Sequence, residues 1–513
     1  MTSVIDSARD ITVRGIARRL VVRGTLELTA PAHFGGGVES DLADMALLRD
    51  VASGGLLLPG TSIAGALRSF LRAYEQGHRE EERPSGGLAE LLLGGQKGDP
   101  DGEQSPLLIA DSLAKPTAIE VRDGVAIDPR TRTARDQKKY NLELVPVGTR
   151  FPLEVELLLP DDEDEAVRLR AALALALGAL QRGEITVGAR GSRGYGACRA
   201  HSWSLTTYDL VNADHLLAYL VAGRSTESDD PNQAGWQRYA VVSPVTHHDD
   251  DIVALLGAPV PTADTRKTVT LTAHFALASP LLIRSDLPEY PGEAPDATHL
   301  RRPKSTEREP VLPGTSVAGA LRARAIRIAN TLGAPNLNAI ESLFGPEQGR
   351  EVGKRTLKAS RLRVSEQAIA NSTSLVQSRV SIDRFTGGAL DTALFSEAPL
   401  TRGDVKLTIT IHDPEDAELG LLMLLLKDLW TGDLPLGGTS SVGRGRLRGI
   451  GAGLSFSPEA LPAALKPTGD GTPQLAWPIG AEERLTIAPA LATYLETCVQ
   501  AIPGWLRQEK KDA

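Results

Sequence analysis

The sequence predicts an α+β protein of two tandem modules, each with a ferredoxin-like (RRM-like) antiparallel sheet, a hairpin and a glycine-rich loop. Three observations support this prediction. The chain has 513 residues, more than one hydrophobic core usually organises. A long motif occurs twice, about 250 residues apart. Within each copy, segments with the apolar alternation of strands are interleaved with segments that have the periodicity of helices.

The repeat is clearest at one motif. Leu-Pro-Gly-Thr-Ser-Ile-Ala-Gly-Ala-Leu-Arg at Leu58 to Arg68 returns at Leu312 to Arg322, with Val317 in place of Ile63 as the only difference. Agreement of that length does not arise by chance, so the chain contains a duplication.

Two more landmarks follow in the same order in both copies. Val125-Ala126-Ile127-Asp128 corresponds to Val380-Ser381-Ile382-Asp383. A glycine-rich loop comes later, with Gly188, Gly194 and Gly196 in the first copy and Gly437, Gly443 and Gly445 in the second. The common spacing divides the chain into module 1 (1–210), a linker or insertion (211–265), module 2 (266–455) and a C-terminal extension (456–513).

The elements are expected in a fixed order. Each copy begins with an alternating apolar segment, which predicts a strand at Leu20 to Thr29 and at Val269 to Ala278. After a long loop, Pro-Gly-Thr-Ser predicts a helix start, where the hydroxyl of Thr61 or Ser62 would cap free amide groups. A basic, hairpin-like region follows.

The second half of each copy repeats this alternation. Strands are expected at Phe151 to Leu157 and Val405 to Ile411, and helices at Glu165 to Leu180 and Ala417 to Trp430. The glycine-rich loop closes the module. The segment 211–265 is rich in polar and turn residues, for example His247 to Asp251, and is therefore expected to be a linker or surface insertion.

Composition excludes several classes of protein. The 56 basic and 65 acidic residues give a formal charge of -9, so a polyanion would have to be held in a local groove. Cys198 and Cys498 form no metal-binding or disulfide pattern. The longest apolar runs are too short to cross a bilayer and the N-terminus lacks a secretory signal, so we expect a cytoplasmic protein without membrane contact.

Several residues are candidates for contacts with a phosphate backbone. A helix that starts after glycine offers N–H groups and a positive dipole end, glycine loops allow close approach, and arginine or lysine neutralises charge. Capping or a solvated surface would explain the same residues without any ligand. No dinucleotide or ATP fingerprint is present, and we expect no organic cofactor. The candidates are Gly60, Thr61, Ser62, Arg68, Arg130, Arg132, Arg135, Lys138, Lys139, Arg190, Arg193, Gly314, Thr315, Ser316, Arg322, Arg384 and Arg444.

The repeated motif, Ile-Asp-Arg-Phe-Thr-Gly-Gly-Ala at Ile382 to Ala389, and the late glycine loop resemble the RAMP superfamily, specifically the backbone subunits of type III CRISPR effector complexes. The resemblance covers both modules. It implies a ferredoxin-like core with a protruding thumb hairpin, stacking along a CRISPR guide RNA, pairing of that guide with a target RNA, and a role in antiviral defence. Other RAMP subunits and the small and large subunits are the implied partners.

The resemblance also implies catalytic residues. Active members carry an aspartate in the loop before the Pro-Gly signature, within Asp-x-x-hydrophobic-hydrophobic-Arg, which matches Asp44 to Arg49 and Asp296 to Arg301. Each aspartate would hold a hydrated Mg²⁺ and assist attack by the 2′-hydroxyl of the target RNA. Arg49 and Arg301 would orient the phosphate or brace their own loops. His299 is a further candidate for proton transfer.

Four alternatives remain open at this point. The chain is either a nuclease that cuts target RNA at two positions or a structural RNA-binding subunit with neither aspartate active. A guide-processing endoribonuclease would usually need a well-placed histidine. A duplicated protein-interaction scaffold would need no basic hairpins. Whether Asp44 and Asp296 project freely or are held by neighbouring backbone would discriminate between the first two.

Overall fold

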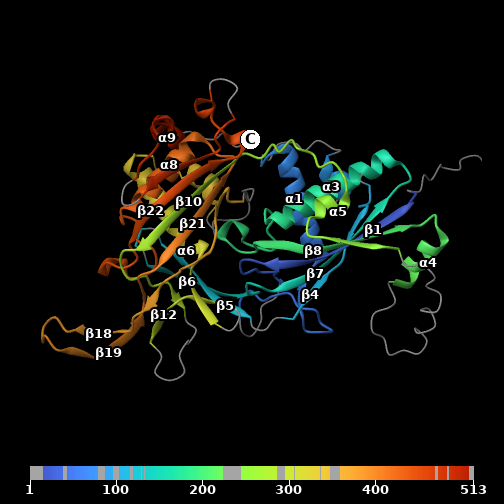
Figure 1. Cartoon of the computed structure of the whole chain (residues 1–513). Coiled ribbons are helices and arrows are strands. Elements are labelled where there is room, and N and C mark those ends of the chain that lie inside the picture. The colour runs from blue at the N-terminus through green and yellow to red at the C-terminus, as the bar shows by residue number, and fades with distance from the viewer. Residues whose placement is uncertain are drawn as a thin grey trace, which may run out of the picture.

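The computed structural model describes residues 15–37, 43–78, 87–95, 103–115, 119–128, 130–131, 133–222, 244–285, 295–304, 307–334, 337–346, 359–467, 472–481 and 485–507. The chain forms two bodies that lie side by side (Figure 1), each with its own hydrophobic core. No helix in these ranges is long and apolar enough to cross a membrane.

Module 1 is built on a five-stranded antiparallel sheet with the order β3-β7-β1-β8-β9. Its strands are β1 (Arg18–Leu28), β3 (Leu107–Ile109), β7 (Arg150–Leu159), β8 (Cys198–Asp209) and β9 (Thr246–Asp249). Helices α1 (Gly60–Gln76) and α3 (Glu163–Arg182) lie together on one face (Figure 1). The chain order β1, α1, β3, β7, α3, β8 is that of the ferredoxin-like fold.

Module 2 repeats this arrangement with the sheet order β15-β21-β10-β22-β23. The elements are β10 (Thr268–Leu277), α6 (Gly314–Thr331), β15 (Leu362–Val364), β21 (Asp404–His412), α8 (Asp416–Trp430), β22 (Leu447–Phe456) and β23 (Ala476–Ala481). The predicted α+β class, with two ferredoxin-like modules, is confirmed.

The shorter elements connect these sheets or extend them. They are β2 (Leu56–Leu58), α2 (Leu88–Leu93), β4 (Ser112–Ala114), η1 (Gly191–Arg193), β11 (Arg284–Ser285), β12 (Ala297–His299), β13 (Arg301–Lys304), β14 (Glu307–Leu312), α7 (Asn338–Phe344), β16 (Gln367–Ala368), β17 (Thr373–Ser374), β20 (Leu400–Thr401), η3 (Ser440–Val442), η4 (Pro458–Ala460) and η5 (Ala463–Leu465). Among the described residues, β12 pairs in parallel with β19 (Ala389–Ala398).

The helix starts differ from the prediction. Both α1 and α6 begin at the glycine of the repeated motif, after Pro59 and Pro313, and neither proline supplies a side-chain cap. Thr61 and Ser62 therefore lie within the first turn, and the expected capping by their hydroxyls is wrong. In α1 the carboxylate of Asp111, from the loop between β3 and β4, accepts the hydrogen bond of the Gly60 amide at 2.7 Å.

The segment expected as a linker contributes structure to module 1. It contains α4 (Ala213–Ala222), β9 and α5 (Ile252–Leu256). Strand β9 pairs with β8, and α5 buries Ile252 and Leu256 in the core of module 1. At the other end of the chain, α9 (Pro489–Arg507) packs along α8 and adds to the core of module 2.

Each module carries a long hairpin in the region where the sequence indicated one. The first consists of β5 (Glu120–Ile127) and β6 (Ala134–Leu144), and the second of β18 (Gln377–Ile382) and β19 (Ala389–Ala398). Figure 1 shows that the first hairpin reaches module 2, whereas the second extends away from both modules.

The modules meet through the base of the first hairpin and the first glycine loop. A Cβ atom at Gly194 would lie 2.5 Å from the Glu366 amide nitrogen, and one at Gly314 would lie 2.4 Å from the Arg193 carbonyl oxygen. Arg122 on β5 donates to both carboxylate oxygens of Glu366 and, at 2.5 Å, to Glu120. At this junction the backbones of the two modules therefore approach closely, and the charges of Arg122, Glu120 and Glu366 are buried.

Candidate nucleic-acid interface

Asp44 and Asp296 occupy equivalent places in the two modules. Oδ2 of Asp44 accepts a hydrogen bond from the Asn141 amide at 2.8 Å, and Oδ2 of Asp296 accepts one from the Ser396 amide at 2.7 Å. The two donors match in register, because Asn141 pairs with Asp123 and Ser396 with Ser378, five residues before the aspartate that ends each hairpin landmark. The duplication has thus preserved an aspartate bound to the inner strand of its own hairpin.

The two carboxylates are held at one oxygen and exposed to solvent. A parallel bridge fixes the loop at each place: Met45 pairs with Leu142, and Ala297 pairs with Glu397. The second oxygen of each aspartate accepts no hydrogen bond from another residue in the described ranges. This geometry combines both alternatives raised by the sequence, since each carboxylate is oriented by backbone and keeps one oxygen that no described residue binds.

The fit of a metal ion can be tested against this geometry. Among the described residues, no group of three His, Cys, Asp or Glu side chains is placed to hold a metal ion. Mg²⁺ usually binds proteins through one or two carboxylates and completes its shell with water and phosphate oxygens. A single oriented carboxylate with one free oxygen fits that limited role, so each aspartate offers one ligand.

Arg49 and Arg301 brace the neighbouring loops. Nη2 of Arg49 lies 3.6 Å from Oε2 of Glu143, a buried carboxylate that also accepts from the Leu47 amide at 3.0 Å. Arg301 donates to the Ser374 hydroxyl at 2.9 Å and to the Arg308 carbonyl at 3.2 Å. The bracing role considered from the sequence is present, and orientation of a phosphate stays a prediction.

His299 is a structural residue. It is buried, its Nδ1 accepts from the Ile283 amide at 3.2 Å, and its Nε2 lies 3.0 Å from the Val311 carbonyl oxygen. Because Nδ1 must accept, the proton resides on Nε2 and is donated to that carbonyl. Burial lowers the pKa of His299 to about 4. The expected proton transfer from His299 to RNA is therefore wrong, because both ring nitrogens are buried and hydrogen-bonded.

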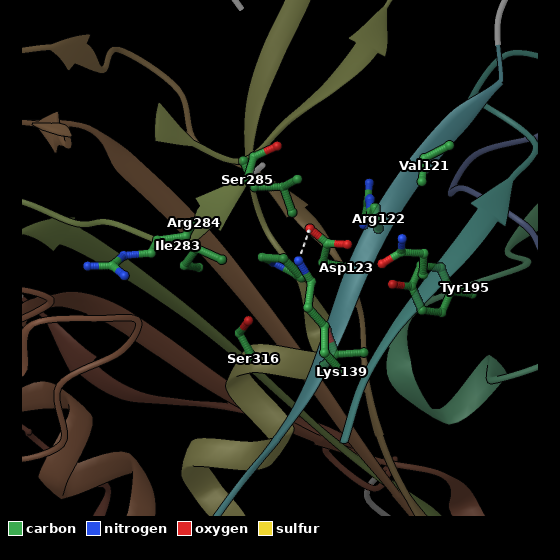
Figure 2. A pocket seen from close by; sticks show the side chains of 13 residues that line it. Val121, Arg122, Asp123, Lys139, Tyr195, Ile283, Arg284, Ser285 and Ser316 are labelled. Atoms are coloured by element: carbon green, nitrogen blue, oxygen red, sulfur yellow. Dashed lines mark ion pairs between the residues drawn. The ribbon is translucent and has the colours of Figure 1, made fainter. Parts of the chain in front are cut away.

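A cavity of about 330 Å³ lies where the two modules meet (Figure 2). Lys139, Asn141 and Tyr195 line it from module 1, and Arg284, Thr315 and Ser316 line it from module 2. Lys139 Nζ is 3.5 Å from Asp123 Oδ2, and Arg284 Nη2 is 3.3 Å from Glu397 Oε1. Since the Asn141 amide holds Asp44, this polar cavity adjoins the first aspartate.

Comparison with known proteins also finds two copies of one module in this chain. A family model described as the RAMP superfamily matches residues 25–199 and again residues 274–448. The chain belongs to the RAMP superfamily. The chain is also similar to the CRISPR system Cms endoribonuclease Csm3 of Methanocaldococcus jannaschii, with 24% identity over 204 residues, which is 36% of this chain and 79% of the relative. The resemblance noted in the sequence is confirmed.

The basic residues of the first RAMP hairpin lie on its exposed part. Arg130 and Lys138 are exposed, and Arg135 Nε is 3.9 Å from Asp128 Oδ2. Arg132 lies outside the described residues. Arg384 is exposed in the turn between β18 and β19. These side chains are placed so that a polyanion lying along either hairpin could reach them.

The arginines of the two repeated helices support neighbouring helices. Arg68 donates to the Leu93 and Gly94 carbonyl oxygens at 2.7 and 2.9 Å, at the end of α2. Arg322 Nη2 is 3.9 Å from Glu341 Oε1 on α7. Both side chains bind the short helix that follows their own helix. Binding of RNA by Arg68 and Arg322 stays a prediction.

The arginines of the glycine loops occupy different environments. Arg190 donates to the Tyr140 hydroxyl at 2.6 Å and stacks on that ring, 4.7 Å from its centroid. Arg193 donates to the Phe344 carbonyl at 3.0 Å across the module junction, and burial lowers its pKa. Arg444 is buried against Glu397 at 2.7 Å and Gln377 at 2.8 Å. Only Arg190 lies beside the Asp44 loop, through Met45.

The glycines and hydroxyls of the repeated motif also separate into two groups. Gly60 and Gly314 are buried, and a Cβ at either would collide with a carbonyl oxygen at 2.2 or 2.3 Å. Thr315 and Ser316 line the cavity, whereas Thr61 is exposed on module 1. Sequence reasoning missed Arg284, Asn141 and Tyr195. Tyr195 lay between two predicted loop glycines and could have been found, while Arg284 and Asn141 belong to no motif.

Proposed function

We propose that this chain is an RNA-binding backbone subunit of a type III CRISPR effector complex that cuts guide-paired target RNA at two places, through Asp44 and Asp296. The main support is the repetition of one arrangement, in which an exposed aspartate accepts from the backbone of its own hairpin. Membership in the RAMP superfamily and similarity to a CRISPR endoribonuclease support the assignment. Guide RNA, target RNA and other subunits of the complex are the proposed partners.

The proposed cleavage uses the nucleophile that RNA itself carries. The 2′-oxygen attacks the adjacent phosphorus, the bond from phosphorus to the 5′-oxygen breaks, and a cyclic 2′,3′-phosphate and a 5′-hydroxyl are formed. The free oxygen of the aspartate accepts the 2′-hydroxyl proton, water donates a proton to the departing 5′-oxygen, and the backbone hydrogen bond fixes the carboxylate. If the aspartate held Mg²⁺ instead, water would accept the 2′-hydroxyl proton and the ion would neutralise charge on the phosphate.

The junction cavity supports RNA binding beside the first aspartate. It combines Lys139 and Arg284 with the hydroxyls of Thr315 and Ser316, which are groups that bind phosphate and ribose oxygens. The chain therefore binds RNA locally at this cavity and along the basic hairpin, in keeping with its overall charge of -9.

The test is cleavage of target RNA by the guide-loaded complex with Mg²⁺, comparing wild type, Asp44→Asn, Asp296→Asn and the double variant. Asparagine keeps an oxygen that accepts the backbone hydrogen bond and removes the charge and the basicity. We expect each single variant to lose one distinct cut by about 100-fold or more, with guide binding intact. Asp50→Asn, a half-buried aspartate in the same loop region whose carboxylate accepts from the Ser53 amide rather than from a hairpin, is the matched control.

A second candidate function is a structural RNA-binding subunit without cleavage. The observation in its favour is that one oxygen of each aspartate is already bound to backbone. Full cleavage by the double variant, with guide binding retained, would establish this second function. Burial of His299 argues against a guide-processing enzyme that depends on it, and copurification of RNA would argue against a protein-only scaffold.

A further inference from the structure

An arginine lies beside each candidate aspartate, and the two arginines come from different parts of the repeat. In module 1 it is Arg190, which precedes η1 in the glycine loop. In module 2 it is Arg379, on strand β18 of the hairpin. Both side chains are half-buried, so each guanidinium is held by the protein and still reaches the surface.

Arg190 contacts both segments that meet at the first aspartate. Its Nη1 donates to the Tyr140 hydroxyl at 2.6 Å, the guanidinium carbon lies 4.7 Å from the centroid of that ring, and Nη2 lies 3.5 Å from Sδ of Met45. Tyr140 precedes Asn141, whose amide binds Asp44, and Met45 follows Asp44 in the chain. The guanidinium is therefore fixed one residue away from the carboxylate on either segment.

Arg379 takes the corresponding place beside the second aspartate. It lies opposite Phe395 in the hairpin, and its Nε is 3.8 Å from Oε2 of Glu397. Phe395 and Glu397 are the two neighbours of Ser396, whose amide binds Asp296. Because alternate residues of a strand point to the same face, Arg379 lies on one face of the hairpin together with both of these neighbours.

The strand register shows that module 1 has no arginine at the position of Arg379. Gly124 pairs with Tyr140 as Arg379 pairs with Phe395, and Tyr140 and Phe395 each precede the residue whose amide binds the aspartate. Gly124 is therefore the counterpart of Arg379. A Cβ atom at Gly124 would collide with the Tyr140 ring, so module 1 has no room for a side chain at this position.

Module 2 in turn has no arginine at the position of Arg190. Arg190 and Thr439 each precede the short helix of their glycine loop, and both have left-handed backbones, with φ values of 61° and 55°. Thr439 carries no charge, and its hydroxyl accepts from Arg444 at 3.3 Å. A guanidinium is thus present beside both aspartates, although one comes from the glycine loop and the other from the hairpin.

A guanidinium at this place suits one task in the cleavage step. It stays charged and carries five N–H donors, so it binds phosphate oxygens and neither gives nor takes a proton. Tyr140 and Met45 each contact one terminal nitrogen of Arg190, which leaves further N–H groups for a ligand. Attack by the 2′-oxygen increases the negative charge on the nonbridging phosphate oxygens, and a fixed donor stabilises that charge most in the transition state.

We propose that Arg190 and Arg379 are catalytic residues that bind the nonbridging oxygens of the scissile phosphate, Arg190 at the cut assigned to Asp44 and Arg379 at the cut assigned to Asp296. This inference rests on the proposed function. The bonds that form and break are those of that reaction, and the arginines change only the charge around the phosphorus. The two sites therefore perform the same step with a cation from a different element.

The first test is single-turnover cleavage of target RNA by the guide-loaded complex with Mg²⁺, comparing wild type, Arg190→Gln and Arg379→Gln. We expect each variant to slow one cut by about 100-fold and to leave the other unchanged, as for loss of one charge-stabilising donor. Arg190→Gln should affect the cut that Asp44→Asn removes. The control is Arg23→Gln, an exposed arginine paired with Glu154, which should cleave like wild type. Normal cleavage by both test variants would overturn the proposal.

An exchange variant separates contact with the phosphate from mere bracing of the hairpin. Arg379→Gly alone is expected to lose the second cut. Adding Thr439→Arg and Phe395→Tyr rebuilds in module 2 the arrangement of module 1, since Thr439 has the same backbone conformation as Arg190. We expect this triple variant to recover the second cut to within about tenfold of the wild-type rate. A triple variant that melts and binds guide like wild type but stays inactive at the second cut would contradict the assigned role.

The aspartate variants show which of the two proposals fails. If Asp44→Asn and Asp296→Asn each remove one cut while Arg190→Gln and Arg379→Gln cleave normally, the proposed function stands and the role of the arginines is wrong. If the aspartate variants cleave normally, the proposed function fails and the inference fails with it. Loss of both cuts in either arginine variant, together with weaker guide binding or a lower melting temperature, would show that the arginine is structural and would also overturn the inference.

Discussion

At the scale of single residues, the most demanding feature is the group of charges buried between the modules. Burial lowers the pKa of Arg122, but the charges of Glu366 and Glu120 outweigh it and raise that pKa well above its usual value. Glu366 also accepts from Arg302 at 3.1 Å. An arrangement of this kind is costly to break, because removing one partner leaves another charge without water and without a counter-ion.

Replacing Glu366 with alanine is expected to destabilise the chain by about 3–5 kcal/mol, since Arg122 would remain buried without its main partner. Chemical denaturation of the full chain measures this difference. Glu154→Ala is the control, because it removes the carboxylate of an exposed pair with Arg23 and should cost about 1 kcal/mol or less. Equal losses for the two variants would show that the junction network does not hold the modules together.

At the scale of elements, the two glycine loops have the same backbone shape but different surroundings. Gly194 and Gly443 have φ values of 90° and 87°, which side chains rarely adopt. Only Gly194 is pressed against another module. Substitutions at these two glycines therefore distinguish two contributions to the free energy of unfolding: the strain of a positive φ, and the clash of a side chain with the other module.

Gly194→Ala is therefore expected to destabilise the chain more than Gly443→Ala. Both variants incur the strain of a positive φ, about 1–2 kcal/mol. Gly194→Ala additionally forces its Cβ to within 2.5 Å of the Glu366 amide nitrogen unless the modules separate. Thermal unfolding of monomeric samples provides the comparison. If both variants melt at the same temperature, the approach at Gly194 is not tight in solution.

The elements show what the sequence could predict. Strands β1, β7, β10 and β21 and helices α3 and α8 follow from apolar periodicity, since each buries one face against its own module. The starts of α1 and α6 lie within the predicted motif, but the cap came from Asp111, whose nearness depends on the sheet. The sequence predicted a linker at β9, because its four residues are polar and show no apolar alternation. The strand forms through backbone pairing with β8, which the side chains do not reveal.

The position of the candidate site could be predicted from motifs in the same way, but the residues that contact it from distant parts of the chain could not. The motif placed Asp44 and Asp296 in matching loops, and the structure adds their backbone donors, which lie 97 and 100 residues further along the chain. Arg444 illustrates the limit. Its basic character suggested a contact with RNA, yet Glu397 and Gln377 surround it in the fold, and no pattern near Arg444 indicates that.

At the scale of the whole molecule, the boundary between the modules lies later than the polar segment suggests. Strand β9 and helix α5 belong to module 1, although they follow residues 223–243 in the chain. After α5, the Pro261 carbonyl accepts from the Tyr74 hydroxyl at 2.6 Å, and the Thr265 amide donates to the Tyr74 carbonyl at 2.9 Å. The connection between modules is therefore held along α1.

A protease site inserted within residues 223–243 tests this arrangement. After cleavage we expect the two fragments to elute together in native gel filtration, because the second fragment carries β9 and α5 and docks through the buried charges. They should separate only in denaturant. Separation of the fragments under native conditions would mean that the covalent connection, rather than the packing, keeps the modules together.

The different surroundings of the two hairpins have a consequence for the molecule as a whole, which is that the chain has polarity. One end presents Leu108 and Leu113 on short strands, and the other presents a long hairpin with Phe385 at its tip. The described residues at the two ends therefore offer different surfaces to their surroundings.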